Sequence, residues 1–399
     1  MRKKFIAAAA IGAISLVCVS LAFSLDRKKK EDLYRQVELF ADVLAIVDTD
    51  YVDEVKPKNM IYGALKGMLA SLDPHSQFMD PDTYNELKAD TEGKFGGLGI
   101  EISIKDGLLT IVTPIEDTPA WKAGLKAGDK IMKINNEPTR GIDLTEAMKK
   151  LRGKPGEPVN LLILRESGKK LLEFRVIRAI IRINDIKEAR ILQDGIGYIR
   201  LVEFRETTPR DFNAAVEKLS KLKMSGFILD LRNNPGGLLE SALEITGKFI
   251  PENKLIVYTK GRKEDQNLEF TSRAKDPILE LPMVVLINEG SASGSEILAG
   301  ALQDYKRAAV IGIKSFGKGS VQTVIPLSDG SGLRLTTSRY FTPLGKEIHG
   351  KGVIPDTVVN NVNKEEDAPA REKKPWDYAS DAQVMAAVNL LKTRTPKQN

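Results

Sequence analysis

Residues 283–305 read MVVLINEGSASGSEILAGALQDY: an apolar run, then a turn of small residues, then an amphipathic segment. The run predicts a buried strand, and apolar side chains recur at helical spacing from Ile297 to Tyr305. The same alternation extends through residues 181–361, where strands are expected at 196–202, 227–231 and 308–313 and helices at 209–222 and 238–249. Such a pattern indicates a layered α/β domain with a mainly parallel sheet.

Ser293 lies where the predicted strand passes into the predicted helix. Free backbone amides and the helix dipole at a helix N-terminus favour developing negative charge. An acyl-transfer nucleophile needs that environment. Taken alone, a serine cluster of this kind is more often a helix-capping turn, so a second element is required.

Lys318 supplies that element. The stretch SFGKGSVQ, residues 315–322, follows a predicted strand and places Lys318 between two glycines, where the backbone can approach closely. A lysine acts as a general base only if its pKa falls, and desolvation in an apolar pocket lowers it. Ser–Lys pairs are known variants of the serine triad, although a lysine in such a loop usually lies at the surface.

The composition excludes several other classes of protein. Of the 399 residues, 42% are hydrophobic and 29% charged, which allows two or three globular domains. The net charge of +6 comes without a basic stripe interleaved with aromatic residues, so nucleic acid is not an expected partner. The single cysteine, Cys18, excludes a disulfide framework. The two histidines, His75 and His349, form no metal-binding motif, so we expect neither a metal nor a cofactor.

Residues 93–180 resemble a PDZ domain. The resemblance is carried by TPAWKAGLKAGDKIMKINN at 118–136 and LRGKPGEPVNLLILR at 151–165, after a cluster of glycines that ends at Gly99. PDZ domains bind an extended peptide as an added strand, and loop amides capture its terminal carboxylate. The resemblance therefore implies a peptide site at Gly97, Leu98, Gly99 and Ile100; the alternative is that the glycines only make a turn.

The ends of the chain predict export and self-association. Residues 1–25 place Arg2, Lys3 and Lys4 before an apolar run, which indicates a signal peptide or an uncleaved signal anchor. Residues 31–90 are predicted to be mostly helical and too small to bury their apolar face alone, so we expect a homo-oligomer. Residues 362–399 are predicted to be a charged linker and a terminal helix at 381–391. The expected location is the periplasm or another space outside the cytoplasm.

Several motifs together resemble the carboxyl-terminal processing peptidases, also called tail-specific proteases. They are LDLRNNPGGLLESALEI at 229–245, GSASGSEILAGALQD at 290–304, SFGKGSVQTVIPLSDGSGLRLTTSRYFTPLGKEI at 315–348, GVIPD at 352–356 and SLDPHSQFM at 71–79. The resemblance covers nearly the whole chain from residue 31. It implies a crotonase-like α/β protease core with an inserted PDZ domain and an N-terminal helical region.

The same resemblance implies roles for individual residues. Ser293 matches the nucleophile, Lys318 the general base and Gln322 the residue that orients the lysine. Lys318 and Gln322 would lie ~13 Å apart on a straight strand, so the chain must bend between them.

An oxyanion hole is implied at the amide of Gly294 together with that of Gly236 or Gly237. Gly294 departs mildly from the alanine or serine expected there, but only its amide is needed. Arg152 matches an arginine that senses a bound tail, with an ordinary surface arginine as the alternative.

The predicted function is therefore a serine endopeptidase that cleaves exported proteins after recognising their accessible C-termini. An adaptor protein is a further expected kind of partner, and the membrane is another if the signal is retained. Two alternatives are a non-catalytic PDZ scaffold and a crotonase-like acyl-transfer enzyme, whose fold also uses backbone oxyanion holes. Intact Ser293, Lys318 and Gln322 argue against the first, and the export signal and PDZ domain argue against the second. Ser–His–Asp chemistry through His349 is a lesser alternative, and His75 is expected to be structural.

Overall fold

A computed structural model describes residues 31–92, 94–105, 107–115, 117–165, 170–182, 184–275, 277–278, 281–360 and 377–394. The predicted export signal at 1–25 and residues 362–376 of the predicted linker lie outside this set. The chain divides into two compact units, Met1–Phe78 and Met79–Asn399. Within the described residues, no helix combines the length and the apolar character needed to cross a membrane.

The N-terminal region is helical, as predicted. Residues 31–50 form one helix, α2 spans Pro57–Ala70 with proline at its start, and α3 spans Pro81–Glu92. The short strand β1, Gln77–Met79, lies between α2 and α3. Large apolar side chains along residues 31–50, among them Leu33, Val37 and Phe40, are exposed. This chain alone leaves an apolar surface there uncovered.

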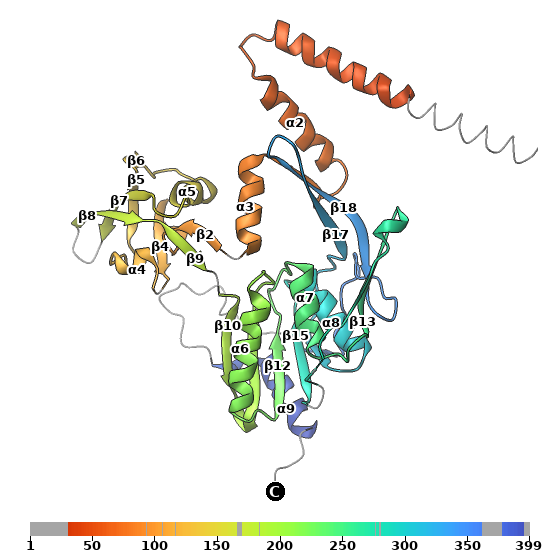
Figure 1. Cartoon of the computed structure of the whole chain (residues 1–399). Helices are drawn as coiled ribbons and strands as arrows, with labels where there is room; N and C mark the ends of the chain where they lie inside the picture. The colour runs from red at the N-terminus through yellow and green to blue at the C-terminus, as the bar shows by residue number, and fades with distance from the viewer. Residues whose placement is uncertain are drawn as a thin grey trace, which may run out of the picture. The chain divides into compact units, whose positions relative to one another are not determined.

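Residues 94–182 form a small β-rich domain (Figure 1). Its elements are β2 (Lys94–Gly97), β3 (Ile100–Lys105), β4 (Leu108–Pro114), α4 (Pro119–Lys122), β5 (Lys130–Ile134), β6 (Glu137–Pro138), α5 (Leu144–Leu151), β7 (Pro158–Arg165), β8 (Lys170–Ile177) and β9 (Ala179–Arg182). The main sheet runs β3-β4-β5-β7-β8 around its own apolar core. Strands β2 and β9, where the chain enters and leaves, pair antiparallel with each other.

The second domain is the predicted α/β layer structure. Its six-stranded sheet runs β10 (Ile186–Ile191), β11 (Ile196–Leu201), β12 (Gly226–Asp230), β15 (Met283–Ile287), β16 (Ala309–Gly312) and β19 (Thr357–Val358). All neighbours are parallel except β10, which pairs antiparallel at one edge. Successive residues of β12 lie on opposite faces of the sheet. Leu229 packs in the apolar cluster on one face, and Ile228 packs in the cluster on the other. The sheet is thus buried on both faces, as parallel sheets are.

Helices cover the two faces of this sheet (Figure 1). On one face lie α6 (Thr208–Lys221), α7 (Leu239–Gly247) and α8 (Gly294–Asp304). On the other lies α9 (Ala382–Arg394), whose Val384, Val388 and Leu391 pack with Ile228 and Leu286. The predicted terminal helix therefore buries its apolar side chains against the sheet of the same chain.

A buried ionic cluster ties α9 to the turn that follows β12. Arg232 donates to Asp230, to Asp381 at 3.0 Å and to Gln383 at 2.9 Å. Asp381 also accepts from the backbone amides of Gln383 and Val384, which caps the helix. The C-terminal helix and the turn carrying Asn234 and Gly236 are consequently held by one guanidinium.

An antiparallel sheet adjoins the layer structure. It contains β13 (Leu255–Gly261), β14 (Glu269–Thr271), β17 (Ser320–Pro326) and β18 (Gly332–Phe341). The hairpin of β17 and β18 begins at Ser320, two residues after Lys318, and the sequence patterns above did not predict it.

Candidate active site

Ser293 is the residue directly before α8, in the turn that joins β15, which ends at Ile287, to that helix. Its φ and ψ are 52° and −113°, a backbone conformation that side-chain-bearing residues rarely adopt. Strained backbone of this kind concentrates at functional sites, where surrounding contacts hold it. The turn after β12 supplies part of that support, because Asn234 O accepts from the Ala292 amide at 3.0 Å and from Ser295 Oγ at 2.9 Å.

Glu296 was not predicted from the sequence, yet its carboxylate joins the two candidate catalytic residues. One oxygen, Oε2, accepts from the Ser293 amide at 2.9 Å and from the Lys318 amide at 2.8 Å. Because both amides bond to the same oxygen, the backbone nitrogens of Ser293 and Lys318 lie no further apart than the sum of the two hydrogen-bond lengths. A serine followed three residues later by glutamate is the capping-box pattern, and that signal could have drawn attention to Glu296.

Lys318 lies in the loop between β16 and β17 and is partly buried. Burial lowers the pKa of the Lys318 ammonium, the positive charge of Arg334 lowers it further, and Glu296 partly offsets both. Among the described residues, its ammonium makes no hydrogen bond or ion pair. The site can thus hold a lysine with a reduced proton affinity, which the role of general base requires.

The loop of Lys318 is fixed against residues 348–352. A Cβ on Gly319 would come within 2.2 Å of the His349 backbone nitrogen, so only glycine fits. Gln322 lies two residues into β17, and its Nε2 donates to Ser320 Oγ at 2.8 Å. The register shifts between Val321 and Gln322, which supplies a bend between Lys318 and Gln322. In the described part of the chain, Gln322 makes no hydrogen bond to Lys318.

The two glycines after β12 differ in whether their backbone amide has a hydrogen-bond acceptor. Gly236 is buried against Ser293, where an added Cβ would lie 2.6 Å from Ser293 Cβ, and its amide donates to Asn234 Oδ1 at 2.9 Å. Gly237 is exposed, and within the described residues neither its amide nor that of Gly294 donates to an acceptor. Among these three glycines, Gly237 and Gly294 are therefore the two whose backbone amides have no acceptor in the described residues.

Within the described residues, His349 does not form a triad with Ser293. Nδ1 of His349 is buried, and the described residues offer it no hydrogen-bond partner, so no carboxylate orients its ring. The backbone amide of His75 donates to Asp73 in the turn after α2.

The predicted peptide site forms a groove in the 94–182 domain. It has a volume of about 230 Å³, and its lining includes Gly97, Leu98, Gly99, Ile100 and Arg152. The amides of Leu98 and Gly99 donate to no acceptor in the described residues, so they remain available to a carboxylate.

Arg152 follows α5 and is one of the residues that line this groove. Its guanidinium stacks on the Phe95 ring at 4.5 Å from the centroid. Phe95 belongs to β2, the strand by which the chain enters the domain. Arg152 therefore contacts both the groove and the connection to the rest of the chain.

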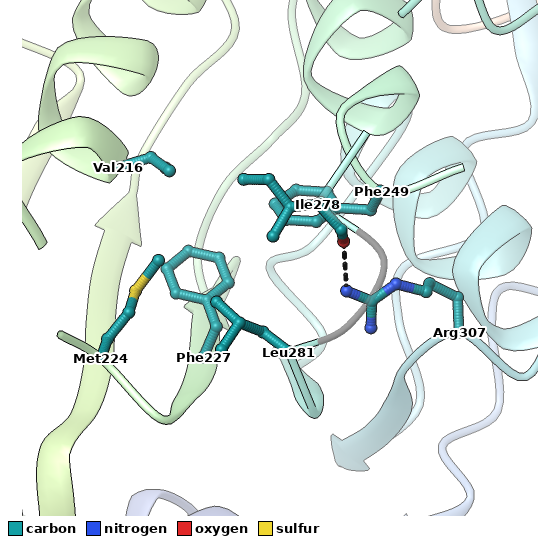
Figure 2. Close-up of a pocket in the computed structure, with 7 residues that line it drawn as sticks. All are labelled: Val216, Met224, Phe227, Phe249, Ile278, Leu281 and Arg307. Atoms are coloured by element: carbon teal, nitrogen blue, oxygen red, sulfur yellow. Dashed lines mark hydrogen bonds between the residues drawn. The ribbon is translucent and has the colours of Figure 1, made fainter. Parts of the chain in front are cut away.

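A further hollow, whose lining residues Figure 2 shows, is too narrow to admit a water molecule. Its lining is mainly apolar and includes Phe227 and Phe249. Arg307 donates there to the Ile278 carbonyl at 2.6 Å. None of the candidate site residues lines this hollow.

The fold and the two sites define a serine peptidase that carries a peptide-binding domain, and comparisons with known proteins agree. Residues 195–359 match peptidase family S41, residues 110–165 match the PDZ domain, and residues 19–83 match the N-terminal domain of the activating protease CtpB. The chain belongs to peptidase family S41, among the carboxy-terminal processing proteases.

Two curated relatives carry this conclusion. A carboxy-terminal-processing protease of Bartonella bacilliformis is 44% identical over 87% of this chain and 80% of its own length. The protease CtpB of Bacillus subtilis is 37% identical over 83% of this chain and 69% of its own length. An S41 protease structure from Bacteroides fragilis, 19% identical, covers 87% of this chain and 92% of its own with a TM-score of 0.53, which supports the fold. The resemblance, the fold class and the peptidase activity predicted from the sequence are confirmed, and the PDZ domain points to peptide substrates.

Proposed function

We propose that the protein is an exported endopeptidase with a Ser293–Lys318 catalytic dyad that cleaves proteins selected by their C-terminal tails. The main support is the shared oxygen of Glu296, which holds the backbones of Ser293 and Lys318 together although they are distant in sequence. The lowered pKa of Lys318 supports the same assignment, because only the neutral amine can accept a proton.

The dyad would work in two steps. Neutral Lys318 Nζ takes the proton of Ser293 Oγ as that oxygen attacks the scissile carbonyl carbon, and the carbonyl electron pair moves to its oxygen. When this intermediate collapses, the lysine returns the proton to the leaving amine. Water then repeats the sequence on the acyl-serine and releases the new C-terminus. Gln322 would orient the lysine once substrate is bound.

We assign the oxyanion hole to the amides of Gly294 and Gly237. Both lack acceptors in the described residues, whereas the Gly236 amide is taken by Asn234. The amide of Gly294 also lies at the start of α8, where the helix dipole favours negative charge. Gly236 would act instead through its close packing under Ser293.

The PDZ domain would select the substrate. A C-terminal tail adds as a strand beside Gly97–Ile100, with its carboxylate on the free amides of Leu98 and Gly99. Arg152 lies at the groove and stacks on Phe95 of the entering strand, so a bound tail can alter that contact. We propose that Arg152 reports occupancy and that the PDZ domain thereby gates the protease.

Export, anchoring and assembly complete the proposal. The basic and apolar residues 1–25 support export to the periplasm or another extracytoplasmic space, with retention on the membrane if the segment is uncleaved. The exposed apolar side chains at residues 31–50 support self-association. A monomeric mass for the protein at micromolar concentration would contradict the assembly, and an adaptor protein is a further expected partner.

Cleavage of an unfolded protein tests the dyad. The full-length chain should degrade fluorescently labelled casein, whereas Ser293→Ala and Lys318→Ala should each lose at least about 100-fold in rate while remaining folded. Lys318→Arg should also be inactive because arginine stays protonated. Lys314→Ala, at an exposed lysine four residues away, is the matched control and should retain activity. Substantial activity in Lys318→Ala would refute the dyad.

A further inference from the structure

The carboxylate of Glu296 is fully buried in the first turn of α8. It forms no ion pair with any residue that the structure describes. Glu146 occupies the corresponding position of α5, and there the carboxylate is half exposed and pairs with Lys150 at 3.1 Å. A buried carboxylate without a cation is expensive unless hydrogen bonds replace its lost water, so Glu296 calls for a different explanation from Glu146.

Four hydrogen-bond donors replace the water that the Glu296 carboxylate loses on burial. In addition to the Ser293 and Lys318 amides on Oε2, Oε1 accepts from Ser315 Oγ at 2.5 Å and from the Gly317 amide at 2.6 Å. A helix-capping role would account for the Ser293 bond alone. The other three donors come from the loop that carries Lys318, so the carboxylate fixes that loop to the nucleophile turn.

We propose that Glu296 is a positioning residue that sets the relation of Ser293 to Lys318 and supports the strained backbone at Ser293. This inference rests on the proposed Ser–Lys mechanism. Only a group with two accepting oxygens satisfies all four donors. A glutamine in its place would turn an NH₂ group toward two of them.

The charge of Glu296 adds a second effect. The charged groups that bear on Lys318 within the described residues are Arg334 on β18 and Glu296 on α8. Glu296 raises the pKa of Lys318, so removing its charge should lower that pKa. Activity requires neutral Lys318, and the rising limb of the pH–rate profile should then move to lower pH.

The test compares Glu296→Gln with the parent as full-length chains on labelled casein across pH. We expect kcat to fall about 100-fold with KM nearly unchanged, because small misplacements of reacting groups have effects of that size. The rising limb should also shift to lower pH. Glu146→Gln, the exposed counterpart, should keep both the parental kcat and the parental profile. A parental kcat in Glu296→Gln, or a loss confined to KM, would overturn the inference.

Two further variants keep the outcome decisive. If Glu296→Gln does not fold, Ser315→Ala removes one of the four donors instead; a folded Ser315→Ala with reduced kcat supports positioning, and one with parental kcat overturns it. Ser293→Ala and Lys318→Ala, measured in parallel, distinguish a failure of the dyad from a failure of the Glu296 proposal. Activity in either variant refutes the dyad. If both are inactive while Glu296→Gln is fully active, only the role of Glu296 is refuted.

Discussion

Replacing Gly236 with alanine should disable the protease by displacing the nucleophile. The new Cβ would lie 2.6 Å from Ser293 Cβ, 2.7 Å from the Ala292 oxygen and 2.8 Å from the Gly294 nitrogen. Two of these atoms are backbone atoms, in Ala292 and in Gly294 at the start of α8, and Cβ of Ser293 is fixed by the backbone, so the backbone must yield. The φ of Gly236 is +101°, which adds a conformational penalty for any side chain.

The two penalties can be separated. Backbone strain at such a φ costs roughly 1–3 kcal/mol, and overpacking a close-packed site costs roughly another 1–3 kcal/mol. Gly330 has a similar φ of +85°, but an added Cβ there meets nothing closer than 3.9 Å. Gly330→Ala should therefore lose only the roughly 1–3 kcal/mol of backbone strain, and its casein cleavage should equal that of the parent.

Urea unfolding followed by circular dichroism and casein cleavage form the paired assay. Gly236→Ala should lose more stability than Gly330→Ala, and its kcat should fall about 100-fold because Ser293 moves away from Lys318. If the two alanine variants lose the same stability and Gly236→Ala cleaves at the parental rate, the packing of Gly236 under Ser293 is refuted.

Three other outcomes follow from the same geometry. Activity should rise with pH through the lowered pKa of Lys318, and Arg334→Met, which removes a charge that lowers this pKa, should move the rising limb to higher pH in a pH–rate profile. Asp381→Ala should reduce the free energy of unfolding by roughly 3–5 kcal/mol in urea titrations, since Arg232 would lose a buried partner. Arg152→Ala should lower the turnover of substrates with C-terminal tails more than it lowers tail affinity measured by calorimetry, because sensing depends on differential contacts; equal turnover would exclude Arg152 as the sensor.

The features that the sequence predicts well are local. The strand, turn and helix around Ser293 follow from a contiguous apolar pattern, and the parallel sheet follows from repeated alternation of the same kind. Ser293 and Lys318 could be named as a pair only through the family resemblance, because neither serine nor lysine has a distinctive pattern by itself.

The features that the sequence does not predict depend on contacts between distant segments. The proposed role of Glu296 requires the loop at 315–318, which only the fold brings to α8. The proposal of Gly237 over Gly236 for the oxyanion hole rests on the side chain of Asn234, which accepts from the Gly236 amide. In the same way, the attachment of α9 depends on Arg232 reaching Asp381 across the sequence.

Trapping the acyl-enzyme tests the central claim most directly. The full-length chain is mixed with casein, quenched in acid at short times and mapped by mass spectrometry of its peptides. The account predicts a substrate acyl group on Ser293, absent in Ser293→Ala and formed about 1,000-fold more slowly in Lys318→Ala. An acyl group on another residue, or parental acylation in Lys318→Ala, would contradict the Ser–Lys mechanism.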